Sequence, residues 1–152
     1  MSLTDTAEPA SKSRLRLWLK LLKASNAIEG ELRRRLRDEF GSTLPRFDVM
    51  SALSRHPDGL KMSEISGLLK VSNGNVTGIV DRLVEDRLAL RVAVPGDRRA
   101  MKVRLTPAGQ ESFGTLAAAH ETWIDDLLDG MENHEIDTLG TLLDRLTLDK
   151  EG

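Results

Sequence analysis

The sequence predicts a mainly α-helical chain that carries one small β-hairpin. Apolar residues repeat at helical spacing over long stretches near both ends of the chain. In the middle, two short helical segments are joined by a tight connection. Directly behind them, two segments of alternating apolar residues flank a Pro-Gly-Asp turn, as in a hairpin. The 152 residues suffice for one domain with a modest core, or for a dimer whose subunits share one.

The first predicted element is one long helix over residues 14–41. Alternate leucines at its start resemble a strand, but apolar residues from Trp18 to Phe40 keep helical spacing. Gly41 is expected to end this helix. Because the start of the helix is too apolar to lie alone in water, we predict a dimerisation helix; a basic helix on a membrane surface is the alternative. Residues 1–13 are polar, so they are expected to form a disordered tail. They lack the apolar segment of a signal peptide.

A compact lobe is expected over residues 42–105. It opens with a helix that has Pro45 in its first turn, and a short helix follows with Ile65, Leu68 and Leu69 facing inward. The segment VSNGNVTGIVDRLVEDRLAL then predicts a second short helix, with Ser72 as its N-cap. Its predicted buried stripe is Val76, Val80, Leu83 and Val84, and its exposed first turns carry Asn73, Asn75, Thr77 and Gly78. Two such helices form a helix-turn-helix pattern.

The predicted hairpin lies within RVAVPGDRRAMKVRLTPAG, residues 91–109. This segment carries five basic side chains and one acid, in a chain whose formal net charge is −2. A hairpin that directly follows the second helix of a helix-turn-helix is a wing. We therefore predict a mainly α winged helix-turn-helix fold with dimerisation helices at both ends of the chain.

Two further helices are predicted over residues 106–150. Thr106 as N-cap and Pro107 at the first helical position give a strong start signal, and Asn133 is expected to cap the second helix. Both helices are apolar on one face and acidic on the other. Only the first helix and a second subunit remain for them to pack against, so we assign residues 106–150 to dimerisation.

Charge is divided unevenly along the chain. Residues 1–110 contain 20 Lys and Arg against 13 Asp and Glu, whereas residues 111–152 contain 2 against 11. The basic part suits a polyanion, and the acidic part would be repelled by one. The alternative is that both parts are ordinary solvated faces.

The predicted lobe suits the chemistry of a DNA duplex. Asparagine forms paired hydrogen bonds with adenine in the major groove, and threonine contacts a base or a thymine methyl. A helix N-terminus binds phosphate, and an arginine in a narrow minor groove meets concentrated negative potential. The candidate DNA-binding residues are Ser72, Asn73, Asn75, Thr77, Arg82, Asp97, Arg98, Arg99, Lys102 and Arg104, with Asp97 expected to hold a neighbouring arginine. The alternatives are that the asparagines only cap the helix and that the hairpin tip is merely solvated.

The segment from VSNGNVTG to RLTPAG resembles the MarR family of bacterial transcriptional regulators. The resemblance runs through the helix-turn-helix, the Asp-Arg-Arg hairpin tip and the Leu-Thr-Pro-Ala-Gly entry into the next helix. It implies a homodimer that binds a pseudopalindromic operator in double-stranded DNA and is released by a small aromatic effector, with Asp97 and Arg99 as the wing pair. Gly78 departs from the pattern, because many members have an arginine there, so operator preference is expected to differ.

The earlier segment, RLWLKLLKASNAIEGELRRRLRDEFGSTLPRFDVMSAL, resembles the subgroup that senses aromatic acids or their coenzyme A thioesters. A thioester needs cations for its phosphates, and its acyl group needs an apolar pocket. The candidate ligand-binding residues that this resemblance implies are Arg16, Trp18, Lys20, Lys23, Arg46, Phe47, Met50, His120 and Trp123. The alternative is that the tryptophans form an interface core and that the cations are solvated.

Other classes of function are disfavoured. The chain has no cysteine, and its three histidines fit no metal-binding spacing. A Gly-rich phosphate loop and a nucleophile elbow are also missing, so we expect no enzyme, no catalytic residues, no metal and no cofactor. No apolar segment is long enough to span a membrane, and the lack of cysteine is compatible with a reducing cytoplasm. A winged-helix dimer that acts only through protein contacts remains the alternative.

Overall fold

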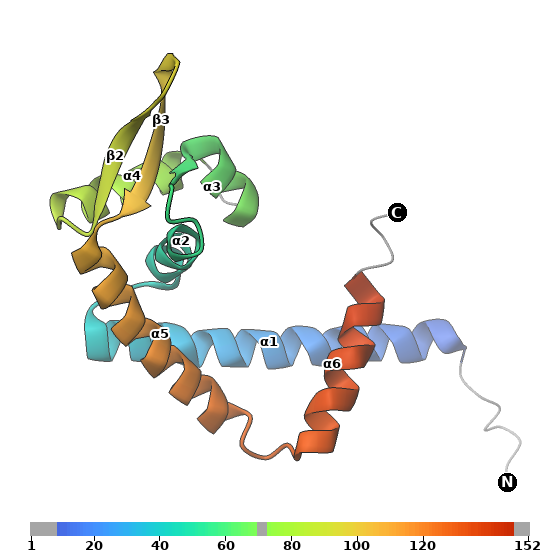
Figure 1. Cartoon of the computed structure of the whole chain (residues 1–152). Coiled ribbons are helices and arrows are strands. Elements are labelled where there is room, and N and C mark those ends of the chain that lie inside the picture. The colour runs from blue at the N-terminus through green and yellow to red at the C-terminus, as the bar shows by residue number, and fades with distance from the viewer. Residues whose placement is uncertain (1–8, 70–72, 148–152) are drawn as a thin grey trace, which may run out of the picture. The chain divides into compact units, whose positions relative to one another are not determined.

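The computed structural model describes residues 9–69 and 73–147. The chain divides into two compact units, Met1–Ala117 and Ala118–Gly152. The elements of the first unit are α1 (Ala10–Phe40), α2 (Leu44–Ser54), β1 (Leu60–Lys61), α3 (Met62–Leu69), α4 (Asn73–Glu85), β2 (Ala89–Val94), β3 (Asp97–Leu105) and the start of α5 (Pro107–Leu127) (Figure 1). The second unit contains the rest of α5 and α6 (Asn133–Thr147). The predicted mainly α fold with a hairpin is confirmed.

The long helix α1 begins earlier than expected. It starts at Ala10, four residues before the predicted boundary at Arg14, because Pro9 cannot occupy a helix interior and stands as the N-cap. Residues 1–8 of the expected tail lie outside the described residues. The predicted stop is confirmed: Gly41 has a left-handed backbone, and its N–H donates to the carbonyl of Arg37 at 3.0 Å.

The core of the first unit lies among α2, α3, α4 and β3. The N-terminus of α2 is capped by Thr43, whose side chain accepts the N–H of Arg46 at 3.2 Å. The fully buried side chains of this core include Val49, Met50, Leu53, Ile65, Val76, Val80, Leu83 and Val103. Leu68 was predicted to face inward, but it is 54% exposed. Ile65 and Leu69 are four residues apart, so they share the face of the short α3 that packs on the core. Leu68 lies to one side of that face and remains exposed.

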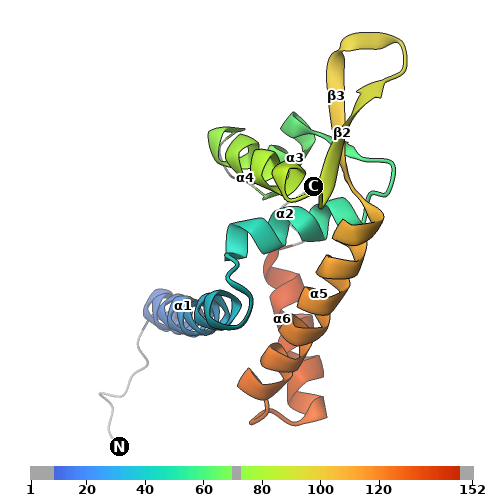
Figure 2. The ribbon, with the colours of Figure 1, turned by 90° about the vertical axis from the view of Figure 1, so that its left-hand side faces the viewer.

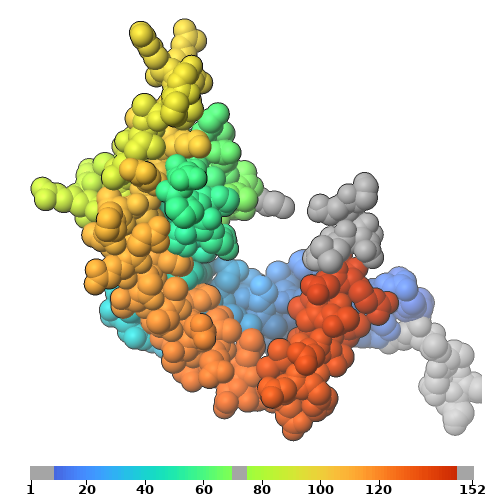
Figure 3. Space-filling view, viewed as in Figure 1, coloured from blue at the N-terminus to red at the C-terminus, as the bar shows by residue number. Residues whose placement is uncertain are grey.

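The hairpin belongs to a three-stranded antiparallel sheet of order β1-β3-β2, so the predicted pair of strands has a third member. The short β1 pairs Leu60 with Val103 on β3. The strands β2 and β3 extend beyond the helices α2 to α4, and their connection stands clear of them (Figures 1 and 2). In the space-filling view, the yellow end of this hairpin projects from the surface of the unit (Figure 3).

The entry into α5 joins three neighbouring segments. Thr106 donates its hydroxyl to the carbonyl of Arg87 at 2.8 Å and accepts the N–H of Gly109 at 3.0 Å, so the predicted cap is confirmed. The N–H of Thr106 also donates to the carbonyl of Leu88 at 3.0 Å. The start of α5 is therefore fixed to the end of α4 and the base of the hairpin.

In the second unit, α6 is capped one residue earlier than predicted. The side chain of Glu135 accepts the N–H of Glu132 at 2.9 Å, and the carbonyl of Glu132 accepts the N–H of Ile136 at 3.0 Å. This is one half of a capping box, in which the third residue of the helix reaches back to the N–H of the cap, with Glu132 in the place predicted for Asn133. The apolar side chains Ile136, Leu139, Leu142, Leu143 and Leu146 of α6 are all exposed in the single chain.

Candidate nucleic-acid interface

The helix α4 has one buried face and one exposed face, as predicted. Val76, Val80 and Leu83 are fully buried. Asn75, Thr77, Gly78 and Arg82 are exposed, and the Arg82 side chain is 70% exposed. The helix thus presents an amide, a hydroxyl and a guanidinium on a surface that begins at its N-terminal turn. Ser72 lies outside the described residues, as does the side chain of Asn73, whose backbone starts the helix.

The C-terminal end of α4 is closed by backbone hydrogen bonds. The N–H of Leu88 donates to the carbonyl of Leu83 at 2.9 Å, and that of Arg87 donates to Val84 at 3.0 Å. This is a Schellman motif, in which the residue after the cap takes the left-handed conformation, and here that residue is Arg87 with φ of 63°. A non-glycine residue in this conformation is uncommon and carries backbone strain.

Two ion pairs between different elements hold α4 and the residue after it against their neighbours. Arg46 of α2 pairs with Asp86 at 2.9 Å, just after α4 ends, and Arg91 of β2 pairs with Asp81 on α4. Arg82 also approaches Asp86, at 3.8 Å. The pair between Arg91 and Asp81 connects the wing with α4. The sequence did not predict this pair, because its two residues lie on different elements and follow no helix or strand spacing.

The wing carries its two arginines next to the turn rather than at its tip. The turn is Pro95-Gly96, where Gly96 has φ of 83°, a conformation that favours glycine. The register shifts between Ala93, which pairs with Met101, and Val94, which pairs with Asp97. Arg98 and Arg99 lie in the resulting bulge and are exposed.

Asp97 has a different role from the one predicted. Its carboxylate accepts the backbone N–H of Arg99 at 3.0 Å, and no described guanidinium forms an ion pair with it. The short side chain is close enough to reach the N–H two residues on, as in an Asx-turn. Asp97 therefore fixes the backbone of the bulge, and the guanidinium groups of Arg98 and Arg99 extend into solvent without an acidic partner among the described residues.

The remaining predicted wing cations share one face of β3. Lys102, which is half-buried, pairs in register with Val92, and the exposed Arg104 pairs with Leu90. Residues two apart on a strand point to the same side, so these cations lie opposite the buried Val103 and Leu105. The structure brings Arg98, Arg99, Lys102 and Arg104 onto one hairpin.

The predicted ligand-binding residues do not converge on one site within either unit. Phe47 and Met50 are core residues, and the Phe47 ring packs on that of Phe113 with centroids 5.4 Å apart. Arg46 is engaged with Asp86. The residues Arg16, Trp18, Lys20 and Lys23 are exposed on α1, whereas in the second unit His120 is half-buried and Trp123 is buried.

The strongest electrostatic perturbation lies on α1, away from these residues. Glu31 accepts hydrogen bonds from the guanidinium groups of Arg34 and Arg35, and these lower its pKa from 4.5 to about 2. Over the described ranges, no cluster of three or more metal-binding side chains occurs, and no helix is both long and apolar enough to cross a membrane.

Comparisons with known proteins agree with this geometry. The sequence model of the MarR family matches residues 40–100. The crystal structure of a MarR family transcriptional regulator from Silicibacter pomeroyi is 34% identical, covers 96% of this chain and 100% of that chain, and has a TM-score of 0.77. The transcriptional activatory protein BadR of Rhodopseudomonas palustris is 30% identical over 117 residues, which are 75% of this chain and 66% of BadR. FabT of Streptococcus pneumoniae, solved in complex with DNA, shares the fold at 23% identity, with 91% and 97% coverage and a TM-score of 0.75.

Proposed function

This chain belongs to the MarR family of transcriptional regulators, and we propose that it binds a pseudopalindromic operator as a homodimer. The observation that carries the proposal is the combination of an exposed polar face on α4 with a wing in which Arg98 and Arg99 lack acidic partners among the described residues. In a dimer, two such helices enter successive major grooves about 34–36 Å apart on one side of the duplex. The wing arginines then reach the flanking minor grooves.

The proposed homodimer rests on apolar surface that the single chain leaves exposed. On α1, Leu15, Leu17, Trp18 and Leu19 are each more than half exposed. Residues 10–28 of α1 contain five Lys and Arg and no acid, whereas residues 111–152 are strongly acidic. Apolar surface of this extent marks protein interfaces, and the opposite charges favour the docking of two copies.

We further propose a repressor that a small aromatic acid, or its coenzyme A thioester, releases from DNA in the cytoplasm. This part rests on the resemblance to aromatic-acid sensors and on the exposed cations Arg16, Lys20 and Lys23 of α1. A ligand releases DNA only if it binds more tightly to the conformation that does not fit the operator. A thermal-shift screen with aromatic acids and acyl-CoA thioesters tests this proposal. If only the free acids raise the melting temperature, the coenzyme A thioester is excluded as the ligand.

A salt series of fluorescence anisotropy titrations tests the DNA-binding proposal. The ligand is a labelled duplex selected from a random pool, and the variant is Arg98→Ala with Arg99→Ala. We expect affinity to fall at least about tenfold and the slope of log K against log salt to decrease by about 2 to 4, because each lost phosphate contact reduces it by about 0.9.

Lys12→Ala with Arg14→Ala removes equal charge from α1 and serves as the control. Light scattering checks that this variant remains a dimer, and its affinity should then be close to that of the unmodified protein. An unchanged affinity and slope in the wing variant would show that the wing does not contact DNA. If the unmodified protein binds no duplex at any salt concentration, the alternative that it acts only through protein contacts replaces the proposal.

A further inference from the structure

Three charged side chains meet where the end of α4 approaches the first turn of α2. The guanidinium of Arg46 on α2 donates a hydrogen bond to Oδ2 of Asp86 at 2.9 Å. The other carboxylate oxygen, Oδ1, lies 3.8 Å from Nε of Arg82 on α4. All three side chains line the same hollow in the surface of the first unit. One carboxylate therefore faces two guanidinium groups, which come from different helices.

The backbone holds both partners of the shorter contact in place. The N–H of Arg46 donates to the side chain of Thr43, which caps α2, at 3.2 Å. The N–H of Asp86 donates to the carbonyl of Arg82 at 2.9 Å. Asp86 thus lies one helical turn after Arg82, and side chains four residues apart share one side of a helix. The position of Asp86 between the two arginines follows from this spacing and from the cap of α2.

Asp86 carries its negative charge at an unfavourable place. The last carbonyl groups of a helix give its C-terminus a partial negative charge, which repels a carboxylate. Asp86 follows directly on the last residue of α4, Glu85, which is also acidic. The proposed function places this helix in the major groove, where the phosphates of the duplex would repel the same carboxylate. Asp86 therefore needs a cation beside it.

The geometry gives this task to Arg46 rather than to Arg82. The contact of Arg46 is a hydrogen-bonded ion pair, and its side chain is only 21% exposed, which limits screening by water. The side chain of Arg82 is 70% exposed, and its distance of 3.8 Å is too long for a hydrogen bond. Within the described part of the chain, Arg82 forms no side-chain hydrogen bond. All five of its N–H donors therefore remain available.

We propose that Arg46 is a positioning residue for DNA binding: it neutralises Asp86 and thereby leaves the guanidinium of Arg82 to contact a DNA phosphate. Without Arg46, the carboxylate of Asp86 attracts Arg82 and repels the duplex, so affinity falls although Arg46 itself does not touch DNA. This role differs from the ligand-binding role that the sequence suggested for Arg46. The inference rests on the proposed function, because it concerns how α4 presents its cation to the duplex.

Fluorescence anisotropy with the selected duplex tests this role. Arg46→Gln is expected to weaken binding about fivefold and to lower the slope of log K against log salt by about 2 per dimer, because Arg82 of each subunit turns to Asp86. Asp86→Asn added to Arg46→Gln should restore both the affinity and the slope, although the ion pair is still missing. Arg46→Lys keeps the positive charge and should bind nearly as tightly as the unmodified protein.

Arg46→Gln with Glu39→Gln is the matched control. It has the same net charge as Arg46→Gln with Asp86→Asn, but it removes an exposed acid of α1 that has no ion pair within the described ranges. This control should bind as weakly as Arg46→Gln alone. Equal recovery in the two double variants would reduce the effect to net charge and overturn the inference. A loss that persists with Asp86→Asn would also overturn it, since Arg46 would then contact DNA directly or serve only the packing of α2 on α4.

Hydrogen exchange at Nε of Arg82, followed by NMR, tests the competition for Asp86 without DNA. We expect Arg46→Gln to slow this exchange at least about threefold, because the Nε–H then bonds to the carboxylate of Asp86. Asp86→Asn should restore the faster exchange. An exchange rate that does not respond to Arg46→Gln overturns the inference. If the rates respond as expected but the unmodified protein binds no duplex, the proposed function fails, and the competition of the two arginines for Asp86 still stands.

Discussion

At the scale of single residues, Gly109 is the most tightly constrained position of the Leu-Thr-Pro-Ala-Gly segment. A Cβ atom there would lie 1.9 Å from the carbonyl oxygen of Leu88, which belongs to the backbone and cannot rotate away. The same carbonyl accepts the N–H of Thr106. The glycine is therefore required for the close approach of α5 to the base of the hairpin, rather than for an unusual backbone angle.

Gly109→Ala is expected to destabilise the protein by at least about 3 kcal/mol, because the added methyl must push the two segments apart. Urea unfolding followed by circular dichroism measures the change. Gly114→Ala, in the same helix, is the control: no atom lies within 4 Å of its added Cβ, and alanine should stabilise the helix by about 1 kcal/mol. Similar midpoints for both variants would contradict the close approach.

Glu31 shows how a residue on an exposed helix surface becomes sensitive to acid. Its pKa is lowered from 4.5 to about 2 by hydrogen bonds from Arg34 and Arg35. A lowered pKa in the folded state means that the stabilisation is fully present above pH 4.5 and is lost as the pH falls toward 2. We expect NMR titration to give Glu31 a pKa well below 4.5, which rises toward 4.5 in the variant Arg34→Gln with Arg35→Gln, and we expect Glu31→Gln to reduce the loss of stability below pH 4.5. A Glu31 pKa near 4.5 in the unmodified protein would contradict this network.

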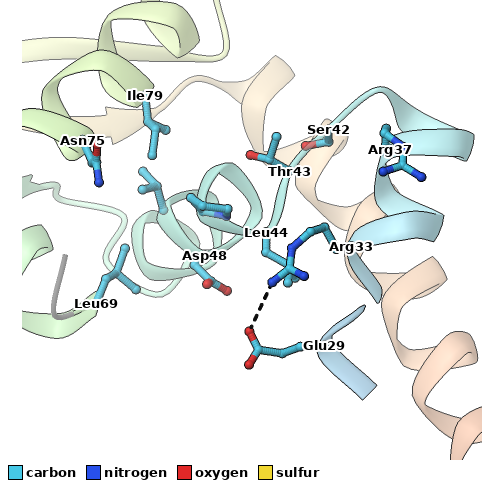
Figure 4. Close-up of a pocket in the computed structure, with 12 residues that line it drawn as sticks. Glu29, Arg33, Arg37, Ser42, Thr43, Leu44, Asp48, Leu69, Asn75 and Ile79 are labelled. Atoms are coloured by element: carbon cyan, nitrogen blue, oxygen red, sulfur yellow. Dashed lines mark ion pairs between the residues drawn. The ribbon is translucent and has the colours of Figure 1, made fainter. Parts of the chain in front are cut away.

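At the scale of elements, local patterns predict those helices whose start and stop signals are local. Thr106-Pro107, Gly41 and the buried stripe of α4 all follow from spacing along the chain. The strand β1 was not predictable, because its two residues are defined by pairing with a distant strand. The bond from the backbone of Arg99 to Asp97 depends on a bulge. The groove that Leu44, Leu69 and Ile79 help to line (Figure 4) depends on four helices that meet in space.

Within α4, Gly78 lowers the intrinsic stability of the helix. It is exposed, and no atom lies within 4 Å of an added Cβ. Gly78→Ala should therefore raise stability by about 1 kcal/mol and leave DNA affinity close to that of the unmodified protein. Gly78→Arg should also increase duplex affinity, with a salt slope steeper by about 2 per dimer if each arginine meets one phosphate. A lower melting temperature for Gly78→Ala, or an unchanged salt slope for Gly78→Arg, would contradict this explanation.

At the scale of the whole molecule, the chain carries more exposed apolar surface on its terminal helices than a stable monomer should. Leu139, Leu142 and Leu143 of α6 are each more than one third exposed, as are several leucines on α1. The charge distribution points the same way, because the basic end of α1 and the acidic residues 111–152 lie on the two parts of the chain that the dimer is proposed to use. The sequence predicts that these apolar faces are buried in an interface. The contacts of that interface could not be predicted, because they involve residues of a second chain.

Leu139→Glu with Leu143→Glu tests whether a second copy of the chain buries the apolar face of α6. Two charges on the apolar face of α6 should convert the dimer to a monomer in light scattering, since burying an unpaired carboxylate is strongly unfavourable. Operator affinity should then fall at least about tenfold, because one subunit reaches only one half-site. Thr141→Glu with Arg145→Gln changes the net charge equally on the opposite face of α6, and this variant should remain a dimer that binds DNA. If the leucine variant also remains a dimer, the subunits associate through another surface, and the spacing of the two α4 helices would have to be set elsewhere.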